Sequence, residues 1–476
     1  MRINYKSILI SAGIIIIAIL LRVLFLNKDS LWLDEGYSCI VALLPFHKML
    51  SMSLSDTNML VHPVILHFWL KLMGGIPESG RILSAIIGIL TVPAAIVLYR
   101  KLFGKSWIVP AILIACSPYL IYFSQEIRCY ALFLLLGLLS NITFLNAFNT
   151  GKRRHFLSYI TVSVLMIFTH IYGVFVPFAH FLFVVLYHKE SAISIKKSLF
   201  LFGIPYSSLL LYLPFLLSKQ TELALRQKQG VTNLLLVFAD FSGGIPVAIL
   251  IFISICVVSI MLRRQILRIC RERQIAFLLL LILSNTLIPF LISLTILPVF
   301  ADRYTVNASI PFLFLVFAIV MRLKNKILQN IIITIIVTAT LSMTIVRTQV
   351  PTREPWREVG EELKKELNAS GTTGLIVGDE WCYDYALKLY FTYNQKLLKV
   401  AQEKYTSSYP DTSTDFKTLC QSNNEIFMIA AHFPGAPDLK NVIEKSFKQV
   451  ESKDYFYFDR YFRKNYEIQL FHFKRE

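Results

Sequence analysis

The sequence predicts a polytopic α-helical membrane protein that carries a small C-terminal α/β domain. Of its 476 residues, 55% are hydrophobic and 16% are charged, and the mean hydropathy is +0.58. This composition is far from that of a soluble domain. Apolar runs of about 20 residues recur up to residue 346 and then stop. We therefore expect a membrane domain over 1–346 and a second domain over 347–476.

Eleven apolar runs in the first part are long enough to cross roughly 30 Å of hydrocarbon. The fifth and sixth runs are joined so tightly at 170–173 that the boundary between them is open. The runs cover residues 8–26, 82–99, 106–123, 129–148, 156–172, 173–187, 198–217, 245–262, 275–297, 305–321 and 327–346.

The basic residues predict the orientation of these runs. Residues 347–476 hold 19 basic and 19 acidic side chains, so the net charge of +18 lies in the membrane part. There, 19 of the 29 Lys and Arg residues fall in short loops on one side, which the positive-inside rule makes cytoplasmic. We expect a plasma-membrane protein with a cytoplasmic N-terminus and an extracytoplasmic C-terminal domain. The polar domain has no basic stripe, so no nucleic-acid partner is expected.

Two further segments have a recognisable pattern. The first outer loop, 27–80, contains SCIVALLPFHKML and VHPVILHFWLKLM, which are apolar but too short to span and predict interfacial helices. The C-terminal domain reads as a helix (PWREVGEELKKEL), a strand (GLIVG), a Tyr-rich helix after Asp379, a strand (EIFMIAAH) and two final Tyr/Phe-rich strands.

The acidic residues of the membrane part gather on the predicted outer side. Two of them, Asp34 and Glu35, follow the first run directly in SLWLDEGYS. Adjacent helical residues point about 100° apart, so the two carboxylates can have different roles. The alternative is that both stabilise the start of a helix. The nine outer acids are Asp29, Asp34, Glu35, Asp56, Glu78, Glu126, Glu222, Asp240 and Asp302.

A second motif lies where the third run meets the fourth. The stretch SPYLIYFSQEIRCYALF places Gln125, Glu126, Arg128 and Tyr130 between two strongly apolar segments. The alternative to a functional site is an ion pair between Glu126 and Arg128 at a helix turn.

A third motif, PVFADRYTVNASIPF, places Arg303 and Tyr304 at the outer entry of the tenth run. Arginine binds phosphate through two parallel hydrogen bonds, and lipid headgroups lie at this depth. The alternative is that Arg303 extends to the interface only to reach water.

His62, in VHPVILHFW, adds an imidazole to the same predicted side. Asp34, His62 and Glu126 form an oxygen and nitrogen set of the kind that binds one divalent cation. The three residues have no sequence-close ligand spacing, so no cofactor is required and the cation stays an alternative. The seven cysteines show neither CxxC pairs nor a disulfide framework.

These motifs together resemble a known family. LWLDEGY after the first run, the HP of VHPVILHFW, YFSQEIRCYAL and the RY before a late run are similar to the prokaryotic GT-C glycosyltransferases of the dolichyl-phosphate-mannose protein mannosyltransferase-like class. That class includes the lipid A aminoarabinose transferases. The resemblance covers roughly residues 8–320 and departs from the family's HPP at His62, Pro63 and Val64.

The resemblance implies transfer of a sugar from a polyprenyl-phosphate carrier to a lipid, glycan or protein acceptor on the outer face. It implies that Asp34 is the base, with Glu35 as its supporting neighbour, and that Glu126 is the second acid. Arg303, with Arg128 and Tyr304, would meet the donor phosphate. His62, Gln125 and Tyr130 complete the predicted substrate site.

Other classes of membrane protein fit the sequence less well. A structural membrane protein with a sensing ectodomain leaves the outer carboxylates unexplained. A secondary transporter or flippase places ionisable groups near the midplane and often shows an internal repeat, whereas here the charges cluster at one interface. An O-antigen ligase or polymerase-type enzyme also handles lipid-linked sugars but is not expected to carry the DE first loop.

Overall fold

The structure is a computed structural model that describes most of the chain. The described residues are 5–54, 59–104, 106–212, 214, 230–370, 375–379, 382–390, 397–400, 424–431, 440–441, 443–459 and 464–475. Two of the predicted outer acids, Asp56 and Glu222, lie outside the described residues, as does most of the seventh run beyond Tyr212.

The chain divides into two compact units. The helical unit comprises Met1–Leu26, Val41–Gly75 and Ser79–Thr348. The sheet unit comprises Gln349–Glu476 together with two short pieces of the first loop, Asn27–Ile40 and Ile76–Glu78. The segment that carries Asp34 and Glu35 therefore folds with the C-terminal domain.

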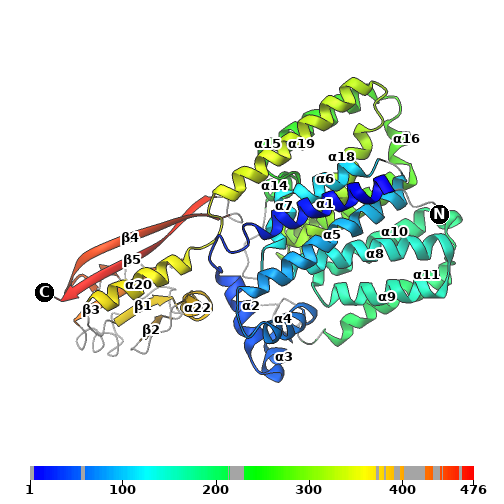
Figure 1. Cartoon of the computed structure of the whole chain (residues 1–476). Helices are drawn as coiled ribbons and strands as arrows, with labels where there is room; N and C mark the ends of the chain where they lie inside the picture. Colours follow the sequence, from blue (N-terminus) through cyan, green and yellow to red (C-terminus); the bar gives the residue numbers. More distant parts are fainter. Residues whose placement is uncertain are drawn as a thin grey trace. The chain divides into compact units, whose positions relative to one another are not determined.

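The helical unit is built from helices and short 3₁₀ turns (Figure 1). Helices of the first loop are α2 (Leu33–Leu43), α3 (Phe46–Leu54) and α4 (Val61–Leu72). The sequence predicted one helix over SCIVALLPFHKML, but the structure has two, α2 and α3. They are divided at Pro45, which lacks a backbone N–H. The remaining elements are α1 (Tyr5–Val23), α5 (Ser79–Phe103), α6 (Ile108–Cys116), α7 (Pro118–Ser124), α8 (Tyr130–Thr150), α9 (Arg153–Ile167), η1 (Ile171–Val174), α10 (Phe175–Leu186), η2 (His188–Glu190), α11 (Ile195–Ser207), η3 (Ser208–Leu211), α14 (Val231–Ser242), α15 (Ile245–Met261), α16 (Ile266–Cys270), α17 (Arg273–Thr295), η4 (Asp302–Ala308), α18 (Ser309–Val320) and α19 (Lys326–Gln349).

The length and hydropathy of these helices are those of an integral membrane protein. Among the described residues, six helical segments are long and apolar enough to cross a membrane, or seven if the bent pair α14 and α15 is one span. Several of the eleven predicted runs form shorter helices, so the number eleven stays a prediction. The predicted third run is two helices, α6 and α7, with Ser117 extended between them.

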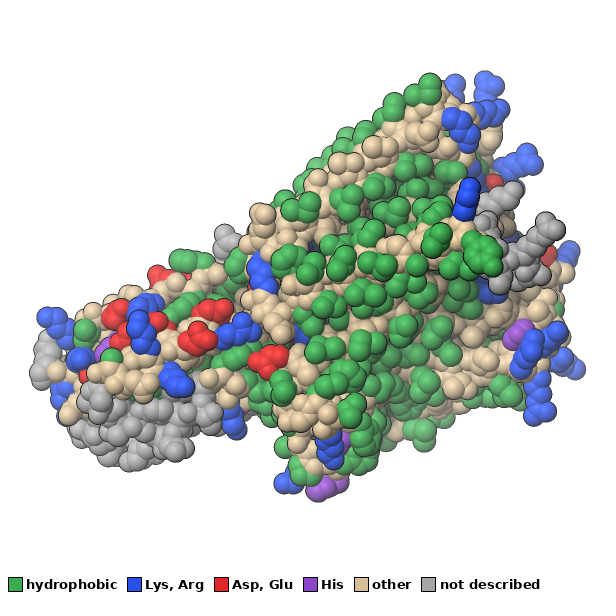
Figure 2. Space-filling view, in the orientation of Figure 1, with side chains coloured by type: hydrophobic (Ala, Val, Ile, Leu, Met, Phe, Trp, Pro, Cys, Tyr) green, Lys and Arg blue, Asp and Glu red, His purple; other side chains and the backbone are tan. Residues whose placement is uncertain are grey.

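The spans differ in how much of their surface the protein covers. In the most apolar stretch of each span, 72% of the residues are buried in α8 and in the span formed by η4 and α18, but only 17% in α1 and 22% in α19. Figure 2 shows hydrophobic side chains covering the visible face of the helical unit, as expected for a surface that faces lipid. Among the described residues, the two most enclosed spans are the one that follows Arg128 and the one that contains Arg303.

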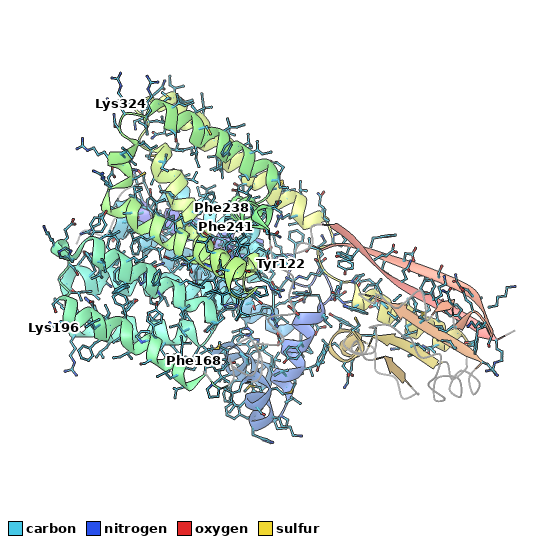
Figure 3. The ribbon with its side chains drawn as sticks, turned by 180° about the vertical axis from the view of Figure 1, so that it is seen from behind. Tyr122, Phe168, Lys196, Phe238, Phe241 and Lys324 are labelled. Atoms are coloured by element: carbon cyan, nitrogen blue, oxygen red, sulfur yellow. The ribbon has the colours of Figure 1, made fainter. Side chains whose placement is uncertain are left out.

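The basic loops gather at one end of the helical unit. Figure 3 shows Lys196 and Lys324 at that end, and Tyr122 and Phe168 away from it. The backbone N–H of Val61, at the start of α4, bonds the carbonyl of Phe168 at 3.0 Å. The first-loop helix α4 is therefore joined to the end of the unit that lacks the basic loops.

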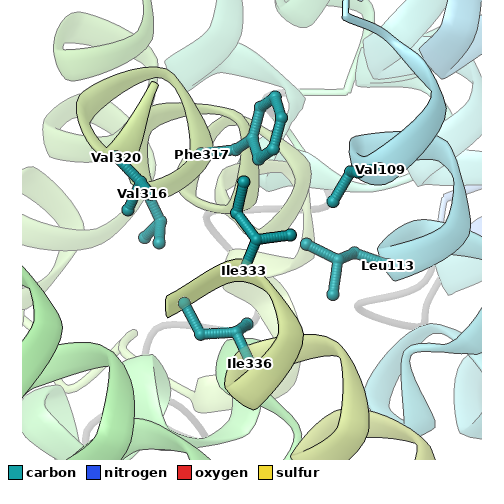
Figure 4. Close-up of a pocket in the computed structure, with 7 residues that line it drawn as sticks. All are labelled: Val109, Leu113, Val316, Phe317, Val320, Ile333 and Ile336. Carbon is teal, nitrogen blue, oxygen red and sulfur yellow. The ribbon is translucent and has the colours of Figure 1, made fainter. Parts of the chain in front are cut away.

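One pocket lies among α6, α18 and α19 (Figure 4). Its lining is entirely apolar and consists of Val109, Leu113, Val316, Phe317, Val320, Ile333 and Ile336. With no polar or ionisable group in its wall, this pocket has no chemistry for catalysis.

The sheet unit contains one five-stranded sheet in the order β2-β1-β3-β5-β4. Strands β1 (Leu375–Asp379), β2 (Leu397–Val400) and β3 (Glu425–Ala430) are parallel, whereas β4 (Phe447–Asp459) and β5 (Lys464–Arg475) form an antiparallel hairpin that pairs with β3. Helix α20 (Trp356–Ser370), a short π-helix η5 (Tyr383–Leu387) and α22 (Lys388–Tyr390) complete the unit. Strand β2 was not predicted from the sequence.

The core of the sheet unit joins α20 to the sheet. Trp356 and Leu363 are fully buried and belong to the same apolar cluster as Phe427 and Ile468, and Leu33 of the first loop packs against it. The strong amphipathic pattern of WREVGEELKKEL thus buries one face of α20 against the sheet.

A buried ion pair fixes the first loop within the sheet unit. The carboxylate of Glu35 is fully buried and its Oε2 lies 2.5 Å from Nη1 of Arg353, whose side chain is 5% exposed. The same Oε2 accepts a hydrogen bond from the backbone N–H of Trp32 at 3.4 Å. Glu35 therefore reaches back over the first turn of α2 as the acid of a capping box does.

Glu354, the residue after Arg353, binds the backbone of Leu33, which immediately precedes Asp34. Its Oε2 accepts from the backbone N–H of Leu33 at 3.0 Å and from the indole Nε1 of Trp356 at 2.5 Å. A side chain at Gly36 is excluded, because its Cβ would lie 1.4 Å from the carbonyl oxygen of Tyr385. These contacts leave the start of α2 little freedom to move within the unit.

Replacing Arg353 by Met is expected to destabilise the sheet unit. Removing one partner of a buried ion pair costs about 3–5 kcal/mol, because the other charge stays buried. The readout is the thermal-unfolding midpoint followed by tryptophan fluorescence, since Trp356 is buried in this unit.

The double variant Glu35→Gln/Arg353→Met should recover most of this loss, since it removes both charges. Lys365→Met is the matched control, because Lys365 is 74% exposed and pairs with Glu362 at the surface. Equal destabilisation in the single and double variants would contradict a buried pair.

Candidate functional site

Asp34 and Glu35 differ in their surroundings, as their adjacent positions on a helix suggest. Both lie in the first turn of α2, so both also favour its positive end. Glu35 is fully buried and paired with Arg353, whereas Asp34 is only half-buried. Asp34 is thus the carboxylate of this pair that retains access to solvent.

The second motif forms the turn between α7 and α8. Gln125 ends α7, and its side-chain amide donates to the backbone carbonyl of Arg22 at 3.1 Å. Glu126 is fully buried and Arg128 is 9% exposed. The backbone N–H of Arg128 bonds the carbonyl of Glu126 at 2.8 Å, which closes the turn. A buried carboxylate and a buried guanidinium therefore stand two residues apart.

The third motif meets the second at a group of aromatic rings. Arg303 lies in η4, where Asp302 Oδ1 accepts from its backbone N–H at 2.7 Å, and its guanidinium is 5.6 Å from the ring of Tyr304. The ring of Tyr130 lies 6.2 Å from that of His170, which in turn lies 4.6 Å from that of Tyr304. The structure thus brings Arg128, Tyr130, Arg303 and Tyr304 together, although the two arginines are far apart in the sequence.

His170 joins this cluster and was missed by the sequence reasoning. Its ring is 4.6 Å from that of Tyr304 and 6.2 Å from that of Tyr130, and it stacks on Phe133 at 5.1 Å. It accepts from the backbone N–H of Tyr172 at 3.2 Å. The signal was present in the sequence, because a histidine between two apolar runs is costly unless it has a role.

Together these residues define an arginine–aromatic cluster, which consists of Arg128, Tyr130, His170, Arg303 and Tyr304. Two cations in an apolar setting attract an anion strongly, because little water screens them. Guanidinium groups match the oxygen geometry of phosphate. The cluster is therefore suited to bind a phosphate group.

His62 lies in α4 and is buried, with 5% of its surface exposed. Burial and the nearby positive charge of Arg128 lower the pKa of His62 to about 3. The imidazole is therefore neutral near pH 7, so it can accept a hydrogen bond or bind a metal but does not act as a cation.

The predicted metal set is divided between the two units. Asp34 belongs to the sheet unit, and His62 and Glu126 belong to the helical unit. Across the described ranges, no group of three or more His, Cys, Asp or Glu side chains is arranged to hold a metal ion. The divalent cation stays a prediction of the sequence.

The stability of the helical unit is expected to fall as the pH is lowered from about 6.5 towards 3. The unfolded chain takes up a proton on His62 in this range while the folded unit does not, so acid favours unfolding. The slope contributed by His62 is at most about 1.4 kcal/mol per pH unit.

His62→Gln should reduce this slope, measured as the thermal midpoint of purified protein across the same pH range. His47→Gln is the matched control, because His47 lies on α3 and is exposed. An unchanged slope in His62→Gln would show that His62 is not held neutral.

No family model matches the sequence, and no curated protein matches it. Solved structures do match: ArnT from Cupriavidus metallidurans in the apo state has a TM-score of 0.61 and 12% identity, with 98% of this chain and 97% of that chain covered. The same protein bound to undecaprenyl phosphate gives 0.58 and 11%, with 98% of each chain covered.

A second protein supports the same assignment. The archaeal oligosaccharyltransferase AglB from Archaeoglobus fulgidus, in complex with an inhibitory peptide and a dolichol-phosphate, has a TM-score of 0.55 and 11% identity, over 98% of this chain and 74% of that chain. ArnT and AglB are both GT-C glycosyltransferases. The resemblance inferred from the sequence motifs is therefore confirmed for the architecture, and this chain has the GT-C fold.

Proposed function

We propose that this protein transfers a sugar from a polyprenyl-phosphate-linked donor to an acceptor on the outer face of the membrane. The observation that carries the proposal is the arginine–aromatic cluster. In it the ring of His170 lies 6.2 Å from that of Tyr130 and 4.6 Å from that of Tyr304, over which the guanidinium of Arg303 lies at 5.6 Å. The GT-C fold supports it, since the similar ArnT and AglB structures hold undecaprenyl phosphate and a dolichol-phosphate.

Arg128 and Arg303 are assigned to the donor phosphate. As the bond from the anomeric carbon to the phosphate oxygen breaks, that oxygen gains negative charge. Preorganised cations stabilise this charge more in the transition state than in the bound donor. Tyr130 and Tyr304 border the same position and are assigned to the donor headgroup.

Asp34 is assigned as the base. The acceptor, a hydroxyl group of a lipid, glycan or protein, loses its proton as its oxygen attacks the anomeric carbon, and a positioned carboxylate takes that proton. Asp34 suits this role better than Glu35, because the carboxylate of Glu35 is engaged by Arg353. We therefore assign Glu35 to the support of α2, Glu126 to the second acid, and Gln125 and His62 to substrate contacts.

The donor also explains the membrane-embedded architecture. An isoprenoid tail keeps the carrier in the bilayer, so the site must lie where its phosphate emerges. The gathering of basic loops at one end of the helical unit supports a cytoplasmic N-terminus and an extracytoplasmic catalytic side in the plasma membrane (Figure 3).

A transporter or flippase for a lipid-linked or anionic substrate is the second candidate. The break between α6 and α7 and the 92° bend between α14 and α15 favour it, because transporters build their sites from interrupted helices. Sugar transfer by the detergent-solubilised protein would exclude pure transport, since no compartments exist there.

The replacement Asp34→Asn is expected to lower donor turnover by about 10²- to 10⁴-fold, the usual contribution of a general base. The assay supplies a panel of polyprenyl-phosphate sugars and candidate acceptors to the protein in lipid. Asp454→Asn is the matched control, since Asp454 is exposed on β4. Full activity of Asp34→Asn, with an active native protein, would overturn this role.

The replacements Arg128→Lys and Arg303→Lys should each weaken binding of undecaprenyl phosphate by about tenfold or more, because lysine keeps the charge but loses the fork of donors. Binding is measured by titrating the lipid into the purified protein. Arg264→Lys, in an exposed basic loop, serves as the control. Native affinity in both cluster variants would show that the phosphate binds elsewhere.

A further inference from the structure

The break between α6 and α7 leaves backbone groups that need partners. Helix α6 ends at Cys116, Ser117 is extended, and Pro118 starts α7. The Ser117 hydroxyl accepts from the backbone N–H of Leu120 at 3.4 Å and so caps the second helix. The last carbonyls of α6 have no helical partner, and unsatisfied carbonyls in an apolar interior are costly.

Arg22, near the end of α1, supplies two of these partners. Its Nη1 donates to the carbonyl of Ala115 at 2.9 Å, and its Nη2 donates to the carbonyl of Ile114 at 3.4 Å. Nη1 also donates to the carbonyl of Ala18, one turn earlier on α1, at 3.3 Å. The hydroxyl of Thr344 satisfies the carbonyl of Cys116 at 2.6 Å.

The same guanidinium reaches the far side of the break. Its Nε donates to the hydroxyl of Ser124 at 3.2 Å, and Ser124 in turn donates to the carbonyl of Leu120 at 2.6 Å. The backbone carbonyl of Arg22 accepts from the side chain of Gln125. Arg22 therefore binds the end of α6 and the end of α7 at once.

The end of α7 is confined on another side by α5. A Cβ at Gly88 would lie 2.1 Å from the Ser124 hydroxyl oxygen, so only glycine lets α7 approach this closely. Ser124 and Gln125 immediately precede Glu126, and Arg128 follows two residues later. Any movement of Ser124 thus passes directly into the turn that carries the two charged residues.

We propose that Arg22 is a positioning residue of the candidate site, which locks the α6–α7 break so that the turn 125–128 presents Glu126 and Arg128 to the substrate. The inference deepens the proposed function and rests on it for the identity of that substrate. Arg22 does not touch the reacting groups; it acts through Ser124 and Gln125.

The chemistry of arginine suits this position. Arg22 is fully buried, and a buried cation is tolerated only where several acceptors surround it. A guanidinium offers five N–H donors in a plane and can serve several acceptors at once, whereas an ammonium group has three donors on a single atom. Replacement by Lys should therefore preserve the charge but hold the two helix ends less firmly.

The test follows the reactivity of Cys129, which lies next to Arg128 and is 2% exposed. In a full-length protein with Cys129 as its single cysteine, the labelling rate with a membrane-permeant maleimide reports how often the turn opens. We expect Arg22→Met to raise this rate by about tenfold or more, since charge-assisted hydrogen bonds are lost, and Arg22→Lys to give an intermediate rate.

Arg100→Met is the matched control, because Arg100 is an exposed arginine of α5 whose guanidinium lies over Trp107. If Arg22→Met does not fold, Ser124→Ala provides the test. It removes only the hydrogen bond from Arg22 to α7 and should also raise the labelling rate of Cys129. Native labelling rates in the folded Arg22 and Ser124 variants would overturn the proposal, even if their thermal midpoints were lowered.

Kinetics separate this inference from the proposed function. If the native protein turns over a donor, Arg22→Met should lower kcat by about 10²-fold, as small displacements of catalytic groups do, with a smaller change in KM. A kcat equal to that of the native protein would overturn the positioning role. If the native protein turns over no donor, the proposed function fails, and the labelling of Cys129 still decides whether Arg22 holds the turn.

Discussion

The need to pair every buried polar group within the chain shapes this protein more than any other constraint. In an apolar surrounding, an unpaired backbone group or charge is costly, so irregular backbone persists only where side chains compensate for it. The break at Ser117 is one such place, and Arg22 and Thr344 satisfy the carbonyls that it exposes. The turn that carries Glu126 and Arg128 lies one short helix, α7, after this break, and Arg22 contacts both ends of that arrangement.

The same constraint explains why the first loop folds with the C-terminal domain. Glu35 is buried only because Arg353 is buried beside it, and the backbone before Asp34 is held by Glu354. The C-terminal residues thus complete the start of α2. A truncation of the tail would remove these partners and would therefore disturb the segment that carries Asp34.

Much of the architecture follows from patterns that act over short distances in the sequence. Six of the predicted apolar runs coincide with the six long apolar helices of the described residues. The amphipathic pattern of WREVGEELKKEL located α20, and short apolar or aromatic runs located most of the strands of the sheet unit. Features that depend on contacts between residues far apart in the sequence could not be predicted from it. The break at Ser117 lies inside a continuous apolar run, and β2 is a strand of four residues. Each has too little local signal to be recognised.

The candidate site shows the same division. The residue types of Asp34, Glu126, Arg128 and Arg303 were enough to single them out, because ionisable side chains are rare in such a sequence. Their partners were not predictable. Nothing local connects Glu35 with a residue 318 positions later, and nothing local connects Arg128 with η4. These contacts are determined by the packing of whole helices.

We propose that the arginine–aromatic cluster holds the phosphate of a lipid carrier. An experimental structure of the protein in lipid nanodiscs with undecaprenyl phosphate would test this role most directly. We expect phosphate density in contact with the guanidinium groups of both Arg128 and Arg303. A well-ordered headgroup bound away from both arginines would show that the phosphate binds elsewhere.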